Sequence, residues 1–188
     1  MACCVDRCTN PLSLVTKLPN YTSDKFLPAA PLPITAATSQ ATAVLINSLS
    51  LIRNYTDSDV LVEGVVQVNI DAITLAAITG TLAVTIDVYR TPTSTLASDR
   101  IYSVTKTLVN VVAITGILGA IRNVIPFQFT DNENTTNYVP APYPLPDGLS
   151  PATYYVRASI LNNGITLGAA TITVVRSDAS ASEEVVFV

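Results

Sequence analysis

Three cysteines are the residues of this sequence whose chemistry stands out. Cys3, Cys4 and Cys8 lie within the first eight positions, and the rest of the chain contains none. Full oxidation of an odd number of thiols requires another molecule, and adjacent cysteines such as Cys3 and Cys4 rarely bond each other because the ring is strained. We therefore expect these thiols to form disulfides between subunits.

Other interpretations of the thiols stay open. They could remain reduced and idle, two chains could share a metal through them, or they could carry palmitoyl groups. A zinc site within one chain is disfavoured, because a closed tetrahedral site needs four ligands and this segment supplies three thiolates without a histidine. We expect no metal ligand and no cofactor.

The residue types needed for most enzyme mechanisms are missing. The chain has no histidine, which excludes imidazole as a base, acid or metal ligand, including the Ser-His-Asp and Cys-His arrangements. None of the seven glycines forms a dinucleotide-binding or phosphate-binding loop. No residue is nominated as a nucleophile, so we expect a protein that is not an enzyme.

The composition points to a domain that associates with other molecules. The chain has 188 residues, of which 49% are hydrophobic and 13% charged, with a net charge of −4. Its mean hydropathy of +0.43 is high for an isolated soluble domain. The length suits one domain with an arm, and the shortage of basic residues argues against nucleic acid as a partner. The surface is expected to bind further copies of the chain.

The apolar content is not concentrated in a membrane span. Its richest windows, 75–83 and 109–121, are interrupted by threonine, asparagine and glycine and fall short of the ~18 apolar residues that a spanning helix needs. The N-terminus lacks the pattern of a signal peptide. We expect synthesis in the cytoplasm without a secretion signal, and a final location outside the cell or on a spore surface, where thiols oxidise.

Prolines divide the chain into an arm and a body. Five of them mark residues 1–40, which we expect to be an extended N-terminal connector, and five mark 131–151, expected as a long loop within a β-domain of residues 41–188. Elsewhere apolar and polar residues alternate, which is typical of half-buried strands. About eight strands are predicted, at 44–53, 60–70, 81–89, 101–109, 123–130, 153–160, 166–176 and 185–188.

The predicted fold class is all-β. Strands at this spacing favour a two-sheet antiparallel sandwich of the jelly-roll kind, with an immunoglobulin-like sandwich as the second choice. Only 72–77 and 111–121 could form an amphipathic helix instead. The Asn162-Asn163-Gly164 sequence predicts a tight hairpin between antiparallel neighbours.

The last residues of the chain are a candidate assembly strand. They form the apolar run Val185, Val186, Phe187 and Val188. An apolar strand at a chain end can extend the sheet of a neighbouring subunit through its unpaired amides and carbonyls. Pairing only within its own sandwich is an equally supported alternative.

The cysteine pattern resembles that of the fibre subunits of bacterial endospore appendages and related spore-surface proteins. Cys3-Cys4 matches the Cys-Cys pair in the N-terminal connector of that family, and Cys8 matches its further cysteine. The resemblance implies a jelly-roll domain without a secretion signal, a connector that forms disulfides with subunits further along a fibre, and sheets joined by strand augmentation. Since the body here has no cysteine, the bonds would run from arm to arm.

The function expected from these features is that of a structural subunit. It would self-assemble into a fibre or layer through sheet edges and apolar contacts, and disulfides from the arm would then cross-link it. Two alternatives remain. One is a viral or phage capsid or tail jelly roll, and the other is an oligomeric tip module that binds a glycan or receptor through the 131–151 loop.

Overall fold

The protein folds as a two-layer sandwich of β-strands. The computed structural model describes residues 20–34, 43–53, 58–71, 73–92, 100–132, 151–165 and 171–184, which form nine strands and no helix. The strands are β1 (Tyr21–Phe26), β2 (Leu32–Ile34), β3 (Val44–Ile52), β4 (Asp59–Ile70), β5 (Ile73–Tyr89), β6 (Arg100–Leu118), β7 (Ile121–Asp131), β8 (Pro151–Asn163) and β9 (Ile172–Glu184). The predicted all-β class is confirmed.

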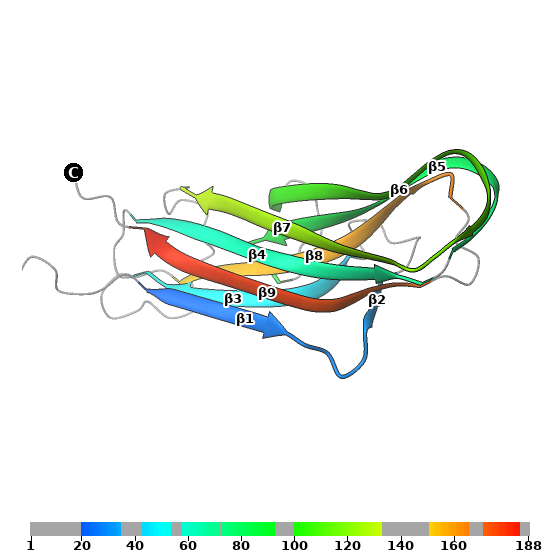
Figure 1. Cartoon of the computed structure of the whole chain (residues 1–188). Helices are drawn as coiled ribbons and strands as arrows, with labels where there is room; N and C mark the ends of the chain where they lie inside the picture. The colour runs from blue at the N-terminus through cyan, green and yellow to red at the C-terminus, as the bar shows by residue number, and fades with distance from the viewer. Residues whose placement is uncertain are drawn as a thin grey trace, which may run out of the picture.

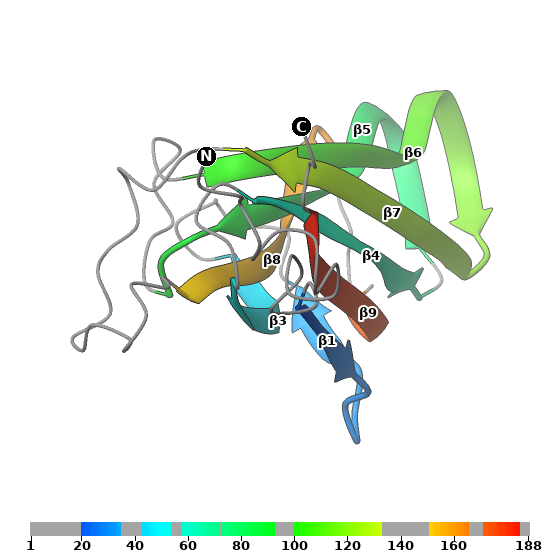
Figure 2. The same ribbon diagram turned by 90° about the vertical axis from the view of Figure 1, so that its left-hand side faces the viewer.

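The strands pair as one long hairpin that has been rolled up. β5 pairs with β6, β4 with β7, β3 with β8 and β1 with β9, all antiparallel and nested one pair within the next. Two further pairings, β4 with β9 and β5 with β8, join these into sheets of order β1-β9-β4-β7 and β3-β8-β5-β6. The result is a jelly roll, with its two layers visible in Figure 1 and from the end in Figure 2.

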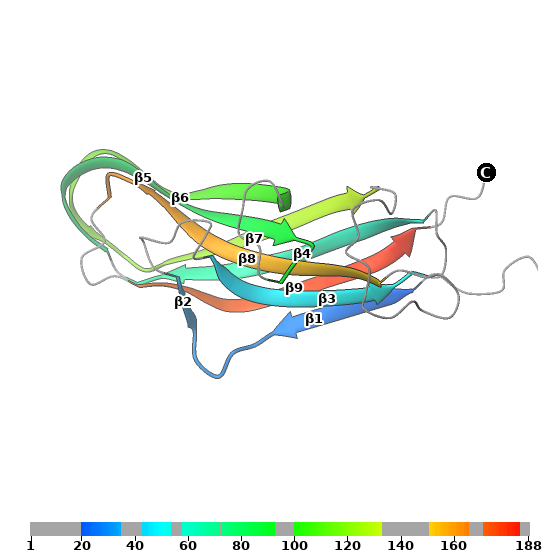
Figure 3. The same ribbon diagram turned by 180° about the vertical axis from the view of Figure 1, so that it is seen from behind.

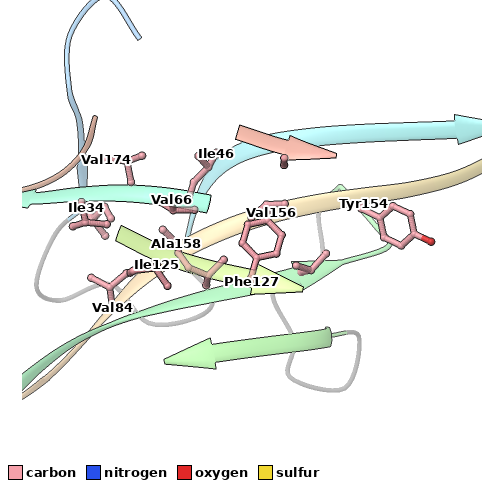
Figure 4. Close-up of a cluster of buried hydrophobic side chains, with 14 of the residues drawn as sticks. Ile34, Ile46, Val66, Val84, Ile125, Phe127, Tyr154, Val156, Ala158 and Val174 are labelled. Carbon is pink, nitrogen blue, oxygen red and sulfur yellow. The ribbon is translucent and has the colours of Figure 1, made fainter. Parts of the chain in front are cut away.

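The alternating pattern of the sequence explains which face of each strand is buried. In β4, Val60, Val62, Val66 and Val68 are fully buried, while Glu63 and Val65 between them are exposed. Successive side chains of a strand point to opposite faces, so one set enters the core and the other faces outward. Figure 4 shows the inward set from both sheets interdigitating, with Val66 and Ile125 from one layer and Val84 and Val156 from the other.

Three segments differ from the expectation drawn from sequence. The stretches 72–77 and 111–121 were considered as possible helices, but residues 73–77 lie in β5 and residues 111–118 in β6. The two strands pair with each other, and their β-branched residues favour extended backbone. Within the segment expected as an arm, β1 and β2 each pair with β9. Figure 3 shows β3 and β8 from the other side, with β1 beside β3.

The predicted hairpin at Asn162-Asn163-Gly164 is wrong, although the turn chemistry is right. Gly164 has a φ of 86°, the positive value expected for a tight turn. The Asn162 side chain closes the turn by accepting from the Ile165 N–H at 3.0 Å and donating to the Ile165 carbonyl at 2.7 Å. However, β8 and β9 belong to different sheets, so the turn directs the chain across the sandwich and not back along β8.

Gly64 leaves the space that the Phe127 ring occupies. A Cβ atom at residue 64 would lie 2.5 Å from Cζ of Phe127 and 2.6 Å from the Asp178 carbonyl oxygen. Because Phe127 is only 3% exposed, its ring has little room to move. The absence of a side chain at this position in β4 is therefore a packing requirement.

We predict that Gly64→Ala lowers the free energy of unfolding by about 1–3 kcal/mol through overpacking. The matched control is Gly119→Ala, since a Cβ there meets no atom within 4 Å. Urea unfolding of both variants measures the effect, and equal stabilities for the two would contradict this account of Gly64. Adding Phe127→Leu to Gly64→Ala is expected to restore part of the loss.

Candidate functional site

The residues expected to make assembly contacts lie outside the described part of the chain. Cys3, Cys4 and Cys8 precede Asn20, the first described residue, and Val185, Val186, Phe187 and Val188 follow Glu184. Residues 133–150 of the expected loop also lie outside it. What the structure places is the root of each segment, together with the strand edges that a neighbouring subunit could reach.

The root of the N-terminal segment is clamped onto two strands. The Asn20 N–H donates to Oε2 of Glu183 at 3.1 Å, and the Glu183 N–H donates to the Asn20 carbonyl at 2.9 Å. The Asn20 side-chain amide donates to the Ile52 carbonyl at the end of β3. Glu183 is 4% exposed, and its Oε1 accepts from the Ser58 hydroxyl at 2.7 Å. These bonds hold residue 20 in one position on the body.

A second polar cluster closes the side of the sandwich where β1 and β3 meet. Oδ2 of Asp24 accepts from the Ser48 N–H at 2.9 Å and from the Asn47 side-chain amide at 3.1 Å. The Ser177 hydroxyl donates to Oδ1 of buried Asn47. Because the amide of Ser48 is already satisfied by Asp24, and the carbonyl of Ile52 by Asn20, the outer edge of β3 is partly occupied.

On the opposite side, β7 is an edge strand that contains a proline. Pro126 lies at the middle of β7 opposite Val65 of β4. Proline cannot donate to a sheet ladder, so it is tolerated in an edge strand where its position faces away from the neighbouring strand. The outer edge of β7 therefore lacks one donor in its centre, which weakens it as a docking edge.

β6 is the longest of the edge strands. It is 19 residues long and, within the described ranges, pairs only with β5. It has no proline, and Lys106 is its single charge between Ile101 and Leu118. Tyr102 near its start stacks on Phe129 of β7 with ring centroids 4.7 Å apart, and Phe129 meets Tyr154 edge-on at 6.3 Å. These ring contacts join the two sheets next to β6, but they leave the outer backbone groups of β6 unpaired within the described ranges.

Buried ionic groups connect neighbouring strands near their ends. Asp131 at the end of β7 accepts from the guanidinium of Arg90 and from the Tyr154 hydroxyl, the latter at 2.9 Å. Asp87 in β5 is fully buried and accepts from Nη1 of Arg100 at 3.3 Å. A buried carboxylate needs such partners because desolvation penalises its charge. Oδ2 of Asp87, in contrast, is buried without a hydrogen bond to any described residue.

A shallow groove crosses the outer face of the β1-β9-β4-β7 sheet. Its volume is about 740 Å³. The residues lining it come from β1, β4, β6, β7 and β9, and are Tyr21, Ser23, Asp24, Lys25, Glu63, Gly64, Val65, Tyr102, Pro126, Phe127, Gln128, Asp178, Ala179 and Ser180. This groove was not predicted from the sequence. The outward alternation of β4 and β7 is readable in the sequence, but which strands lie side by side is not.

The described residues form neither a metal-binding cluster nor a membrane-spanning helix. Among those described, no group of three or more cysteine, aspartate and glutamate side chains could hold a metal ion. No helix among them has the length and apolar character needed to cross a bilayer.

Comparison with known proteins finds no matching family model and no matching curated protein. One similar solved structure is entitled "Structure of infectious bursal disease virus Gt strain", with 11% sequence identity and a TM-score of 0.25. The match covers 90% of this chain and 36% of that chain, so the present chain spans about a third of the viral protein's length. A likeness this low bears on neither the fold nor the function of this protein.

We predict that Glu183→Ala loosens the root of the N-terminal segment. The change removes the acceptor of the Asn20 N–H and of the Ser58 hydroxyl, and we expect a loss of about 1–3 kcal/mol in unfolding free energy. Amide hydrogen exchange at Asn20 should become faster. Glu184→Ala is the control because that side chain is exposed. Unchanged exchange at Asn20 in Glu183→Ala would contradict the clamp.

Proposed function

We propose that this protein is a structural subunit that self-assembles into a fibre or layer outside the cell or on a spore surface. The observation that carries the proposal is β6, a long edge strand with one paired side and almost no charge. Open edges with few charges are the usual template for pairing with another chain, and proteins that remain monomeric blunt them. Among the other edge strands, β3 is partly occupied by Asp24 and Asn20, β7 contains Pro126, and the short β1 carries Asp24 and Lys25. In β6, Lys106 is the single charge between Ile101 and Leu118.

The composition of the surface supports the same proposal. Charged residues make up 13% of the chain, about half the usual share. Several large apolar side chains are exposed on the outer faces of both sheets, among them Val124 at 56% and Leu161 at 60%. Apolar contact adds to edge pairing when two such surfaces meet. Edge pairing would set the orientation of neighbours, and apolar burial would provide much of the association energy.

The N-terminal thiols would then make the assembly covalent. Two thiols of different subunits lose two electrons and two protons to dioxygen, directly or through an oxidised thiol carrier, and form one disulfide. The chain would stay reduced in the cytoplasm and oxidise after release. In this proposal Cys3, Cys4 and Cys8 bond from arm to arm, because the body of the domain contains no cysteine.

Electrophoresis and electron microscopy test the covalent and non-covalent parts separately. Material assembled in air is expected to show open filaments or sheets, and a ladder of multimers in denaturing gels that collapses to monomer with reductant. The triple variant Cys3→Ser, Cys4→Ser, Cys8→Ser is expected to assemble but to run as monomer in both gels. Monomer bands alone from wild-type material would refute the disulfides, and closed shells would favour the capsid alternative.

The role of the β6 edge is tested by a charge substitution. Thr107→Lys places a second lysine beside Lys106 on the exposed part of β6, and we expect it to reduce polymer yield several-fold because edge lysines oppose strand pairing. Thr130→Lys makes the same change on β7, whose edge Pro126 already interrupts, and should have little effect. Light scattering follows assembly. An equal response of the two variants would argue against β6 as the docking edge.

A further inference from the structure

The groove across the β1-β9-β4-β7 sheet is built from two rows of outward side chains. One row runs Ser23, Ser180, Glu63 and Gln128, and the other runs Lys25, Asp178, Val65 and Pro126, each from β1 to β7 in register. Neighbouring strands are about 4.8 Å apart, so a row of four strands spans roughly 14 Å. The groove therefore crosses the strands and accepts an elongated ligand.

The floor of the groove offers no backbone to a ligand. β9 pairs with β1 and β4, and β4 pairs with β9 and β7, along the rows that form the groove. Their amides and carbonyls are used in these ladders, so an extended peptide cannot add to them as a further strand. A ligand here must be recognised by side chains.

The groove has no excess of positive charge. Its lining holds the carboxylates of Asp24, Glu63 and Asp178 and one cation, Lys25. Counting also Arg176, whose Nε donates to Oδ2 of Asp178 at 2.7 Å, three negative and two positive charges leave a net charge of −1. A phosphorylated or sulfated ligand would find no excess of positive charge there. The groove is also open, whereas sites for small apolar molecules bury most of the ligand surface. Both observations disfavour anionic ligands and small apolar molecules, and they are compatible with an uncharged, polar ligand.

The polar groups of the groove have unused hydrogen-bonding capacity. The side chains of Ser23, Lys25, Glu63, Gln128 and Ser180 make no hydrogen bond or ion pair with any described residue. A carboxylate and a primary amide are planar groups that can each bridge two adjacent hydroxyls, and Gln128 both donates and accepts. They lie in the row with the two serines, which supply hydroxyls.

The groove also has aromatic and apolar surface at intervals. Tyr21, which is 67% exposed, lines it at the β1 side, and Tyr102 lines it from β6. Val65 and Pro126 of the second row add apolar surface. Tyrosine offers a flat apolar face with a polar tip at a small entropic cost. Such faces suit the C–H surface of a sugar ring, whose hydroxyls point to the sides.

We propose that this groove binds a neutral oligosaccharide that lies across the four strands. Tyr21 would stack on one ring near the β1 end, while Glu63 and Gln128 would bond hydroxyl groups nearer β7. This ligand site is additional to the self-assembly proposed above and does not depend on it, since both rows of the groove lie on β1, β9, β4 and β7 and only Tyr102 comes from β6. An assembled fibre or layer would display one such groove for each subunit.

The test is binding of the full chain to an array of neutral oligosaccharides, from disaccharides to hexasaccharides, with sulfated and sialylated glycans beside them. The array hit is then titrated calorimetrically. We expect saturable binding of at least one neutral oligosaccharide, and about tenfold weaker binding, or about 1.4 kcal/mol, in both Tyr21→Ala and Gln128→Ala. Circular dichroism and urea unfolding check that each variant is folded.

Matched controls are Gln67→Ala and Tyr155→Ala, which change the same residue types at positions that do not line the groove. Both should bind as wild type. Absence of binding to every neutral glycan would overturn the proposal, as would an equal loss in the controls or binding of anionic glycans alone. A synthetic peptide of residues 1–19 is tested in parallel. If that peptide binds and no sugar does, the groove is a dock for the arm.

Discussion

The antiparallel pairing of β4 with β9 is the interaction on which the rest of this structure depends. The nested pairs alone would form one long ribbon, and a two-stranded ribbon has no face that it can bury. Joining β4 to β9, over a register that runs from Asp59↔Glu184 to Ile70↔Ile172, and β5 to β8 in the same way, rolls that ribbon into two sheets. The inward valines of β4 then acquire the opposite sheet as a packing partner.

The same pairing decides which backbone groups stay available to other molecules. Once β9 and β4 lie in the centre of one sheet, only β1 with β2 and β7 remain at its edges, and only β3 and β6 at the edges of the other. Asp24 and Asn20 satisfy part of β3, Pro126 interrupts β7, and β6 is left with little protection. In the self-assembly proposed above, these unequal edges would make the contacts to neighbouring subunits unequal too.

The polar groups of the described region fall into two sets, one bonded within the fold and one facing outward. Glu183, Asp131 and Asp24 are tied to partners that lie far away in the sequence, and each fixes the end or side of a strand. Groups that lie outward on the groove, such as Glu63 and Gln128, have no such partners among the described residues. Burial explains the difference between the two sets, because a buried polar group needs a hydrogen-bond partner within the protein, whereas an exposed one can bond to water.

The sequence by itself determined the all-β class, most of the strands after residue 40 and the faces they bury, and it excluded imidazole chemistry. Two-residue periodicity, a tight turn at Gly164 and the lack of histidine are local or compositional properties. Only the tertiary structure decided which strands are neighbours, and with them the clamp between Asn20 and Glu183, the open edge of β6 and the groove over Gly64. Periodicity reports whether a residue faces inward, whereas pairing depends on contacts between residues far apart in the chain. The turn after β8 satisfied every local rule of a hairpin and still led to the opposite sheet, because β3 and β5 already occupy both edges of β8.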